Sequence, residues 1–228
     1  MKRLTDYRTL VFDCDGVILD SNRVKTEAFF QAALPYGESA ATALVDFHVE
    51  NGGVSRYEKF DHFLRKIVPE GKQGPGLKDL LVEFADQVRD GLGTCEQAAG
   101  LAELRNHTSG ARWMVASGGD QDELREVFKA REIAEFFDGG IFGSPDAKQD
   151  IVLREYASGR LQTPALFLGD SKLDWKVAQS CGLDFVFIHG WTEVKDWEYW
   201  TRSKKLRVAP CLQSLLREDL AVLNAPAQ

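Results

Sequence analysis

The sequence predicts an α/β protein with a Rossmann-like parallel sheet and an all-helical insert after the first strand. Two observations support this class. Short, nearly continuous apolar runs alternate with amphipathic stretches along most of the chain, an order typical of an open parallel sheet covered by helices. Between residues 20 and 90, by contrast, helical periodicity dominates and no buried strand is evident.

Five apolar runs are predicted to be strands. Each is rich in β-branched or aromatic residues, as strands buried on both faces of a sheet are. They are TLVFD at 9–13, RWMVAS at 112–117, GGIFG at 139–143, ALFLGD at 165–170 and DFVFIH at 184–189, the last of which is expected at the sheet edge. Ligands of such sheets bind at the carboxyl ends of the strands, so the residues that follow these runs are candidates for function.

Helices are predicted between the later strands and throughout the insert. Amphipathic patterns in the core cover 95–107, 120–133, 148–158 and 171–182. In the insert they cover 22–34, 41–53, 55–68 and 76–92, separated by Gly and Pro. The predicted division is therefore a core made of 1–19 and 91–228 and a helical insert at 20–90.

Composition excludes several classes of protein. The apolar fraction of 44% and the charged fraction of 28% over 228 residues are ordinary for a soluble globular protein. A net charge of −7 argues against general nucleic-acid binding but allows a small anionic ligand. No apolar window reaches the roughly 18 residues of a membrane span, and no secretory signal is evident. The four cysteines form no CxxC pair, so a reducing, cytoplasmic location is expected.

Two acids close the first predicted strand, in the order Asp13-Cys14-Asp15-Gly16. Carboxylates at i and i+2 of an extended chain project to the same side. Together they form a negative pocket suited to a hard cation such as Mg²⁺, whereas zinc would require His or Cys ligands. For this motif alone, the alternative is a turn with two solvated acids.

A second pair of acids follows the strand at 165–170. Asp170 closes the strand, and Asp174 lies one helical turn further on, so both carboxylates can face one point. They are candidates for the same metal site. The alternative is that Asp170 caps the following helix and Asp174 is a first-turn acid favoured by the helix dipole.

Ser117 and Lys148 follow two other predicted strands. In Ser117-Gly118-Gly119, a hydroxyl and flexible backbone precede a helix, which suits an anion site or, alternatively, an N-cap. Val115 occupies the first glycine position of a GxSxG elbow, so a serine hydrolase is not expected. Lys148 by itself indicates only a surface lysine, and its place after a strand makes it a candidate.

Four motifs in this order resemble the signatures of the haloacid dehalogenase superfamily. They are VFDCDGVILD, VASGG, GSPDAK and LFLGDSKLD, each at a strand end. The resemblance covers the whole chain, and the insert is similar to the helical cap that opens and closes over the site in this family. Asp15 matches the second acid that the phosphatases and phosphomutases keep, so the resemblance implies a branch like phosphoglycolate phosphatase and β-phosphoglucomutase.

The resemblance implies a catalytic role for each motif. Asp13 would be the nucleophile that forms an aspartyl-phosphate. Asp15 would protonate the leaving oxygen and then activate water. Ser117 and the Gly118 amide would hold phosphoryl oxygens, and Lys148 would pair with Asp13 and the phosphate.

The resemblance also implies Mg²⁺ as the cofactor. The Asp13 carboxylate, the Asp15 backbone carbonyl and Asp170 would hold the ion. Asp174 would be a further acid at the metal, either directly or through water.

Specificity is expected to come from the cap. Lys25 lies close behind the first strand, where related sugar-phosphate enzymes place a residue that faces the site. Asn51 and Arg56 bound a turn that resembles the family's substrate-contacting cap loop. For Lys25 and Arg56 the alternative is a solvated helix face, and His48 and Tyr57 are expected in the core of the cap.

The leading expectation is a Mg²⁺-dependent phosphatase acting on a small phosphorylated metabolite, with neither nucleic acid nor a membrane as partner. One alternative is a phosphomutase of the same fold, which returns the phosphoryl group to a sugar. Another is a catalytically silent binding module, against which the intact set of Asp13, Asp15, Lys148 and Asp170 speaks. A monomer or a homodimer is expected.

Overall fold

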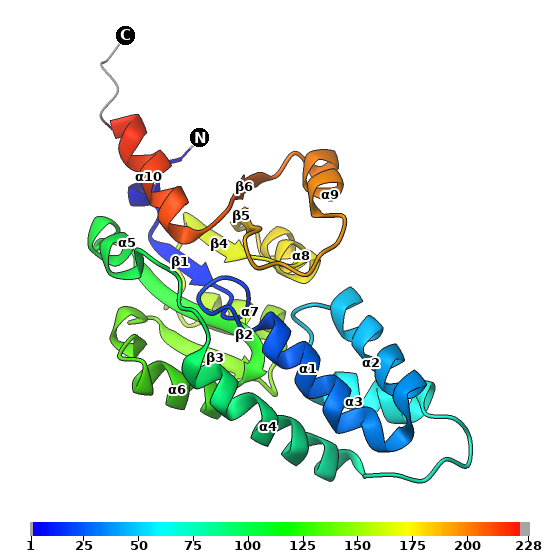
Figure 1. Cartoon of the computed structure of the whole chain (residues 1–228). Helices are drawn as coiled ribbons and strands as arrows, with labels where there is room; N and C mark the ends of the chain where they lie inside the picture. Colours follow the sequence, from blue (N-terminus) through cyan, green and yellow to red (C-terminus); the bar gives the residue numbers. More distant parts are fainter. Residues whose placement is uncertain (1, 224–228) are drawn as a thin grey trace.

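A computed structural model describes residues 2–223 and has an α/β core with helices grouped at one end of the sheet (Figure 1). Within these residues, six parallel strands form one sheet. In spatial order they are β3 (Gly140–Ser144), β2 (Arg112–Asp120), β1 (Thr9–Phe12), β4 (Ala165–Gly169), β5 (Asp184–Ile188) and β6 (Arg207–Ala209). The predicted Rossmann-like α/β class is therefore confirmed.

Helices cover both faces of the sheet. Leu10 and Phe12 of β1 belong to a hydrophobic cluster with α5 (Leu101–His107), α6 (Gln121–Ala130) and α10 (Leu212–Leu223). Val11, between them, packs in a second cluster with α7 (Lys148–Ala157) and α8 (Lys172–Ser180). Successive side chains of a strand point to opposite faces, so burial on both explains the continuous apolar run.

The sequence analysis missed β6, α10 and α9 (Trp197–Lys204) near the end of the described chain. β6 has three residues, of which only Ala209 is buried, and so short a strand leaves no apolar run. Its presence corrects the expectation that 184–189 forms the edge, because β5 is paired on both sides. Helix α5 begins at Leu101 rather than at 95, after Gly100 in the left-handed region.

Four helices follow β1 and form the cap: α1 (Asn22–Ala33), α2 (Glu38–Glu50), α3 (Arg56–His62) and α4 (Leu77–Thr94). Phe29, Phe60 and Phe84 bring α1, α3 and α4 together, with ring centroids 4.4 to 5.8 Å apart. Helix α4 runs without a break from the cap toward α6 (Figure 1), so the boundary at residue 90 stays a prediction. None of the helices within residues 2–223 is long and apolar enough to cross a membrane.

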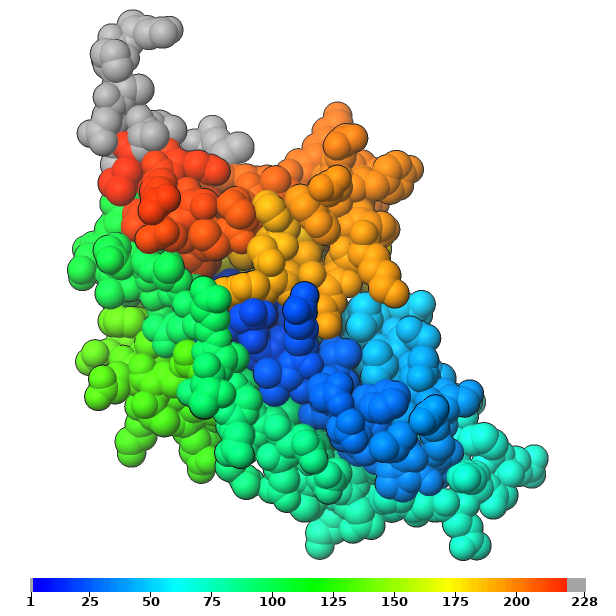
Figure 2. Space-filling view, in the orientation of Figure 1, coloured from blue at the N-terminus to red at the C-terminus, as the bar shows by residue number. Residues whose placement is uncertain are grey.

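The carboxyl ends of β1 to β4 face the cap (Figure 1). The segment between β5 and α9 reaches the cap as well, and Figure 2 shows it against α1 and α2. Asn22 Nδ2 donates to the Trp191 carbonyl at 2.9 Å, and the Thr26 hydroxyl donates to Glu193 at 2.9 Å. The space above the strand ends is therefore bounded by the sheet, the cap and this segment.

Candidate active site

Lys148 lies between two carboxylates at the centre of the site. Its Nζ is 2.6 Å from Asp13 Oδ2, at the end of β1, and 2.6 Å from Asp174 Oδ1, in the first turn of α8. All three side chains are buried. Burial raises the pKa of Asp13 above its usual range despite the nearby Lys148 charge. Although burial opposes a charged amine, the two carboxylates hold the pKa of Lys148 above its usual range.

Asp13, Asp170 and Asp174 could hold a metal ion, because each offers a carboxylate oxygen within 4.8 Å of the others. Burial, and then the charges of Asp13 and Asp174, raise the pKa of Asp170 well above its usual range. The three carboxylates offer only oxygen ligands, and they bear more negative charge than Lys148 can neutralise. Such a buried set fits a hard cation such as Mg²⁺. Gly16 permits the close packing here, since a Cβ at that position would lie 2.1 Å from Asp170 Oδ2.

Neither Asp170 nor Ser117 has the helix-capping role that was the alternative for it. Ser171 caps α8, and its Oγ accepts from the Asp174 amide at 3.2 Å. Asp120 caps α6, accepting from two backbone amides at 3.1 Å. Asp174 is a first-turn acid of α8, as the alternative for it had it, and it also belongs to the site. Its Oδ2 accepts from the Ser171 amide, while its Oδ1 contacts Lys148.

Asp15 is paired with Lys25 of the cap. Lys25 Nζ is 2.6 Å from Asp15 Oδ2, and the Ser21 hydroxyl donates to Asp15 Oδ1 at 2.6 Å. Burial alone would raise the pKa of Asp15, but the Lys25 charge and these hydrogen bonds hold it below its usual range. The pair keeps Asp15 ionised and places Lys25 in the site, not on a solvated helix face.

The end of β2 brings a flexible backbone against the cap. Ser117 is buried, and its Oγ accepts from the Gly119 amide at 3.0 Å. Gly118 and Gly119 line the same pocket as Asp13. A Cβ at Gly118 would lie 2.3 Å from the Gly53 carbonyl oxygen, so the cap loop touches the strand end directly.

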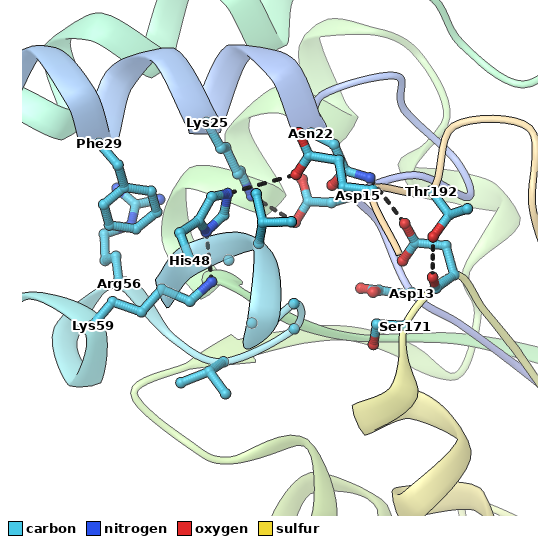
Figure 3. Close-up of a pocket in the computed structure, with 18 of the residues that line it drawn as sticks. Asp13, Asp15, Asn22, Lys25, Phe29, His48, Arg56, Lys59, Ser171 and Thr192 are labelled. Atoms are coloured by element: carbon cyan, nitrogen blue, oxygen red, sulfur yellow. Dashed lines mark hydrogen bonds and ion pairs between the residues drawn. The ribbon is translucent and has the colours of Figure 1, made fainter. Parts of the chain in front are cut away.

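A pocket of about 60 Å³ extends from the strand ends into the cap. Figure 3 shows Asp13 and Ser171 toward one end and Phe29, Arg56 and Lys59 toward the other. Its charged core residues are acids, whereas the charged side chains of the cap are cations. The lining includes Asp13, Asp15 and Asp170 from the core and Lys25, His48, Arg56 and Lys59 from the cap.

Arg56 lines this pocket and also links the cap to the core. Its guanidinium pairs with both oxygens of Glu123 in α6, at 3.0 and 2.5 Å. The neighbouring Tyr57, expected in the cap core, is partly exposed, and its hydroxyl donates to Asp120 Oδ2 at 2.8 Å. Asn51 lies outside this pocket; its side chain donates to the Phe47 carbonyl at 2.8 Å and lines an adjacent pocket.

Two further cap residues face the pocket and were not predicted there. Lys59 Nζ is 2.7 Å from His48 Nδ1, and both residues line the cavity. Lys59 follows Arg56 by three positions, a helical spacing that could have indicated a shared face. For His48, expected in the cap core, no motif gave a signal, because its position depends on how α2 packs against α1 and α3.

A parallel sheet covered by helices, with buried acids and a lysine at its strand ends and a helical cap above them, defines a capped Rossmann-like α/β protein. The sequence profile described as haloacid dehalogenase-like hydrolase matches residues 7–182. The chain therefore belongs to the haloacid dehalogenase-like hydrolase family. Comparison with the curated proteins gives no significant match.

Solved structures share this fold at low sequence identity. CbbY of Rhodobacter sphaeroides in complex with phosphate is 19% identical, with a TM-score of 0.66 over 92% of this chain and 95% of that chain. β-Phosphoglucomutase of Clostridium difficile is 16% identical, with a TM-score of 0.68 over 96% and 99%. A haloacid dehalogenase-like hydrolase of Streptococcus pneumoniae is 19% identical, with a TM-score of 0.66 over 96% and 98%. At these identities the likeness shows the fold, which extends over core and cap.

Proposed function

We propose that this chain is a Mg²⁺-dependent phosphatase that hydrolyses a small phosphate monoester of the cytoplasm through an aspartyl-phosphate on Asp13. The observation that carries the proposal is the position of Lys148, 2.6 Å from both Asp13 and Asp174, with Asp170 completing an acidic cluster. Family membership and the fold shared with the phosphate-bound CbbY support it.

In the first half-reaction, a carboxylate oxygen of Asp13 attacks phosphorus in line with the ester oxygen. The new P–O bond forms as the ester bond breaks, and Asp15 gives its proton to the leaving oxygen. Lys148, the Ser117 hydroxyl and the Gly118 amide offset the negative charge of the phosphoryl oxygens. Such charge stabilisation and positioning carry most of phosphoryl transfer.

In the second half-reaction, Asp15 takes a proton from water while the water oxygen attacks phosphorus. The bond to Asp13 breaks, which releases phosphate and restores the nucleophile. The contact of Asp15 with Lys25 suits this half, because it keeps Asp15 ionised. The first half requires a protonated Asp15, so substrate binding has to loosen that pair.

The metal would bind beside the nucleophile. Asp13, Asp170 and Asp174 would supply carboxylate oxygens, and Asp15 its backbone carbonyl. When bound, Mg²⁺ would add the positive charge that lets a phosphoryl dianion approach these acids.

The test is phosphate release from p-nitrophenyl phosphate with Mg²⁺, followed by addition of a chelator and then of excess Mg²⁺. We expect turnover to stop with chelator and return with the metal.

Asp13→Asn should abolish turnover, because an amide is a poor nucleophile, while circular dichroism should show that the fold is kept. Asp150→Asn, an exposed acid in the first turn of α7, is the control and should behave as wild type. Retention of more than about a tenth of the rate in Asp13→Asn would rule out this nucleophile.

A phosphomutase is the alternative, because the β-phosphoglucomutase of C. difficile shares the fold of core and cap. A mutase needs a phosphoryl group to begin its cycle. A bisphosphorylated sugar that strongly stimulates conversion of a sugar phosphate, without net release of phosphate, would favour this alternative over hydrolysis.

A further inference from the structure

The proposed phosphoryl site lies at one end of the pocket, and the cations of the cap lie toward the other end (Figure 3). A phosphoryl group held at Asp13 would point the rest of the substrate toward Lys25, His48 and Lys59 (Figure 3). The cavity of about 60 Å³ is small, so the substrate part that enters the cap is compact unless the cap moves. The chemistry at the cap end therefore bears on which phosphate ester fits.

Three cap cations line the pocket, and two of them already have carboxylate partners. Lys25 is 2.6 Å from Asp15, and Arg56 contacts both oxygens of Glu123. Lys59 is only 2% exposed, yet among the residues described by the structure it forms no ion pair with a carboxylate. A buried ammonium without a counter-charge is costly, which marks Lys59 as different from its neighbours.

The only side-chain hydrogen bond found for Lys59 within residues 2–223 goes to an uncharged imidazole. Burial, and then the nearby charges of Lys59 and Lys25, lower the pKa of His48 to about 2. Because His48 Nδ1 accepts from Lys59 at 2.7 Å, the ring proton belongs on Nε2. That nitrogen is buried and has no hydrogen-bond partner in the described chain. Lys59 has two further N–H groups, so the pair presents three unused donors and no acceptor.

Glu193 is the acid nearest to this pair. Its Oε2 lies 3.9 Å from His48 Nε2, beyond hydrogen-bond distance, and its carboxylate accepts from the Thr26 hydroxyl at 2.9 Å. Burial raises the pKa of Glu193, which weakens it as a counter-charge. The donors of Lys59 and His48 are thus left for a group that the chain itself does not supply.

We propose that Lys59 and His48 form a subsite for a second anionic group, a carboxylate or a phosphoryl group, on the leaving part of the substrate. The inference rests on the proposed phosphatase function and narrows its substrate class to compact phosphate esters with two anionic groups. Lys59 supplies the charge and His48 Nε2 a directed donor. Lys25 and Arg56 contribute less to this recognition, because Asp15 and Glu123 neutralise them.

Three two-carbon esters test the subsite, and they differ only in the group distal to the phosphate. They are 2-hydroxyethyl phosphate, which is neutral there, 2-phosphoglycolate, which has a carboxylate, and ethane-1,2-diyl bisphosphate. For wild type we expect kcat/KM to be at least about tenfold higher for one or both anionic esters than for the neutral one. The ester that gains identifies which anion the subsite takes.

Lys59→Met should remove this preference. We expect kcat/KM for the preferred anionic ester to fall about ten- to a hundredfold, and that for 2-hydroxyethyl phosphate to stay within about threefold. His48→Phe keeps the ring but removes the donor, and should give a smaller selective loss. Lys59→Arg should recover part of the preference. Lys66→Met, an exposed lysine on the same cap, is the matched control and should match wild type.

Binding separates failure of the subsite from failure of the catalytic proposal. In an Asp13→Asn background, calorimetry should show weaker binding of the preferred anionic ester when Lys59→Met is added. Equal losses for charged and neutral esters, or wild-type preference in Lys59→Met, would overturn the subsite while hydrolysis stands. If wild type releases no phosphate from these esters or from p-nitrophenyl phosphate, the catalytic proposal fails. In that case the binding measurement still tests the subsite, and unchanged binding of both anionic esters on addition of Lys59→Met would overturn it as well.

Discussion

Neighbouring charges set the ionisation of single residues at this site. Lys148 sits between Asp13 and Asp174, and Lys25 sits against Asp15, so each of these two buried amines has a carboxylate oxygen at 2.6 Å. Lys59 breaks this pattern, since its close partner is His48. A buried residue that costs folding energy at a pocket is typical of a binding function, because functional sites are often less stable than they could be.

Lys59 should therefore destabilise the ligand-free protein in a pH-dependent way. Burial, and then the Lys25 charge, lower the pKa of Lys59 to about 7, against about 10.4 for an unfolded lysine. Between these values the unfolded chain binds more protons, so the stability contribution of Lys59 rises with pH, and its penalty is full below about pH 7. We expect Lys59→Met to raise the free energy of unfolding near pH 6, by an amount that shrinks as pH approaches 10, in denaturant titrations.

The charges acting on Lys59 are those of Lys25, Asp15, Lys148 and Glu193, from the cap, the strand ends and the segment before α9. None of them is changed in Lys59→Met, so the difference between the two proteins isolates the lysine. Lys66→Met should show no such pH trend. A Lys59→Met variant that is less stable at every pH would mean that the contact with His48 outweighs the cost of burial.

Residues at the strand ends that line the candidate site were predictable because they occur in short motifs. Asp13, Asp15, Lys148 and Asp170 each follow a buried strand, and parallel strands bring their carboxyl ends to one edge. His48 and Lys59 could not be found in this way, because their meeting depends on the packing of two cap helices. Arg56 was predicted as a substrate contact, but its pairing with Glu123 joins residues 67 positions apart and has no local signal.

At the scale of elements, the turn between α2 and α3 docks on the end of β2. The contact is backbone against backbone, with Gly118 facing the Gly53 carbonyl. Gly53 has a φ of +85°, a conformation in which other residues are strained. The second glycine-containing motif, VASGG, therefore has a steric role besides any phosphate contact, since only glycine at position 118 lets the cap loop come this close.

Gly118→Ala should impair turnover by pushing the cap loop away. The added Cβ would lie 2.3 Å from the Gly53 carbonyl oxygen, so backbone must shift although the Gly118 amide is retained. We expect kcat/KM for p-nitrophenyl phosphate to fall about tenfold or more, because small displacements at a site are costly. Gly110→Ala is the control, since a Cβ there would meet nothing within 4 Å. Unchanged kinetics in Gly118→Ala would show that the loop need not contact β2 during turnover.

Over the whole molecule, the sequence predicted the sheet and the cap but not the connections between them. Buried parallel strands and amphipathic helices leave periodic patterns, and these gave the fold class. The short edge strand β6 and helix α9 leave weak patterns. Cap and core are joined by single side-chain pairs, Arg56 with Glu123 and Tyr57 with Asp120. Such pairs leave no periodic pattern in the sequence, so they could not be predicted from it.

The pair of Arg56 and Glu123 should hold α3 onto the core. Arg56 is 6% exposed, so Glu123→Gln would leave a buried guanidinium without its counter-charge, which is strongly destabilising. Because α3 makes this contact and α10 does not, the effect should be local. We expect amide hydrogen exchange in α3 to become at least about tenfold faster in Glu123→Gln, with α10 unchanged. Asp61→Asn, which breaks the exposed pair with Arg65 on the same cap, should change exchange by less than about twofold, because exposed helix pairs contribute little. Equal effects of the two substitutions would mean that the aromatic packing of Phe29, Phe60 and Phe84 holds α3 in place without help from the Arg56–Glu123 pair.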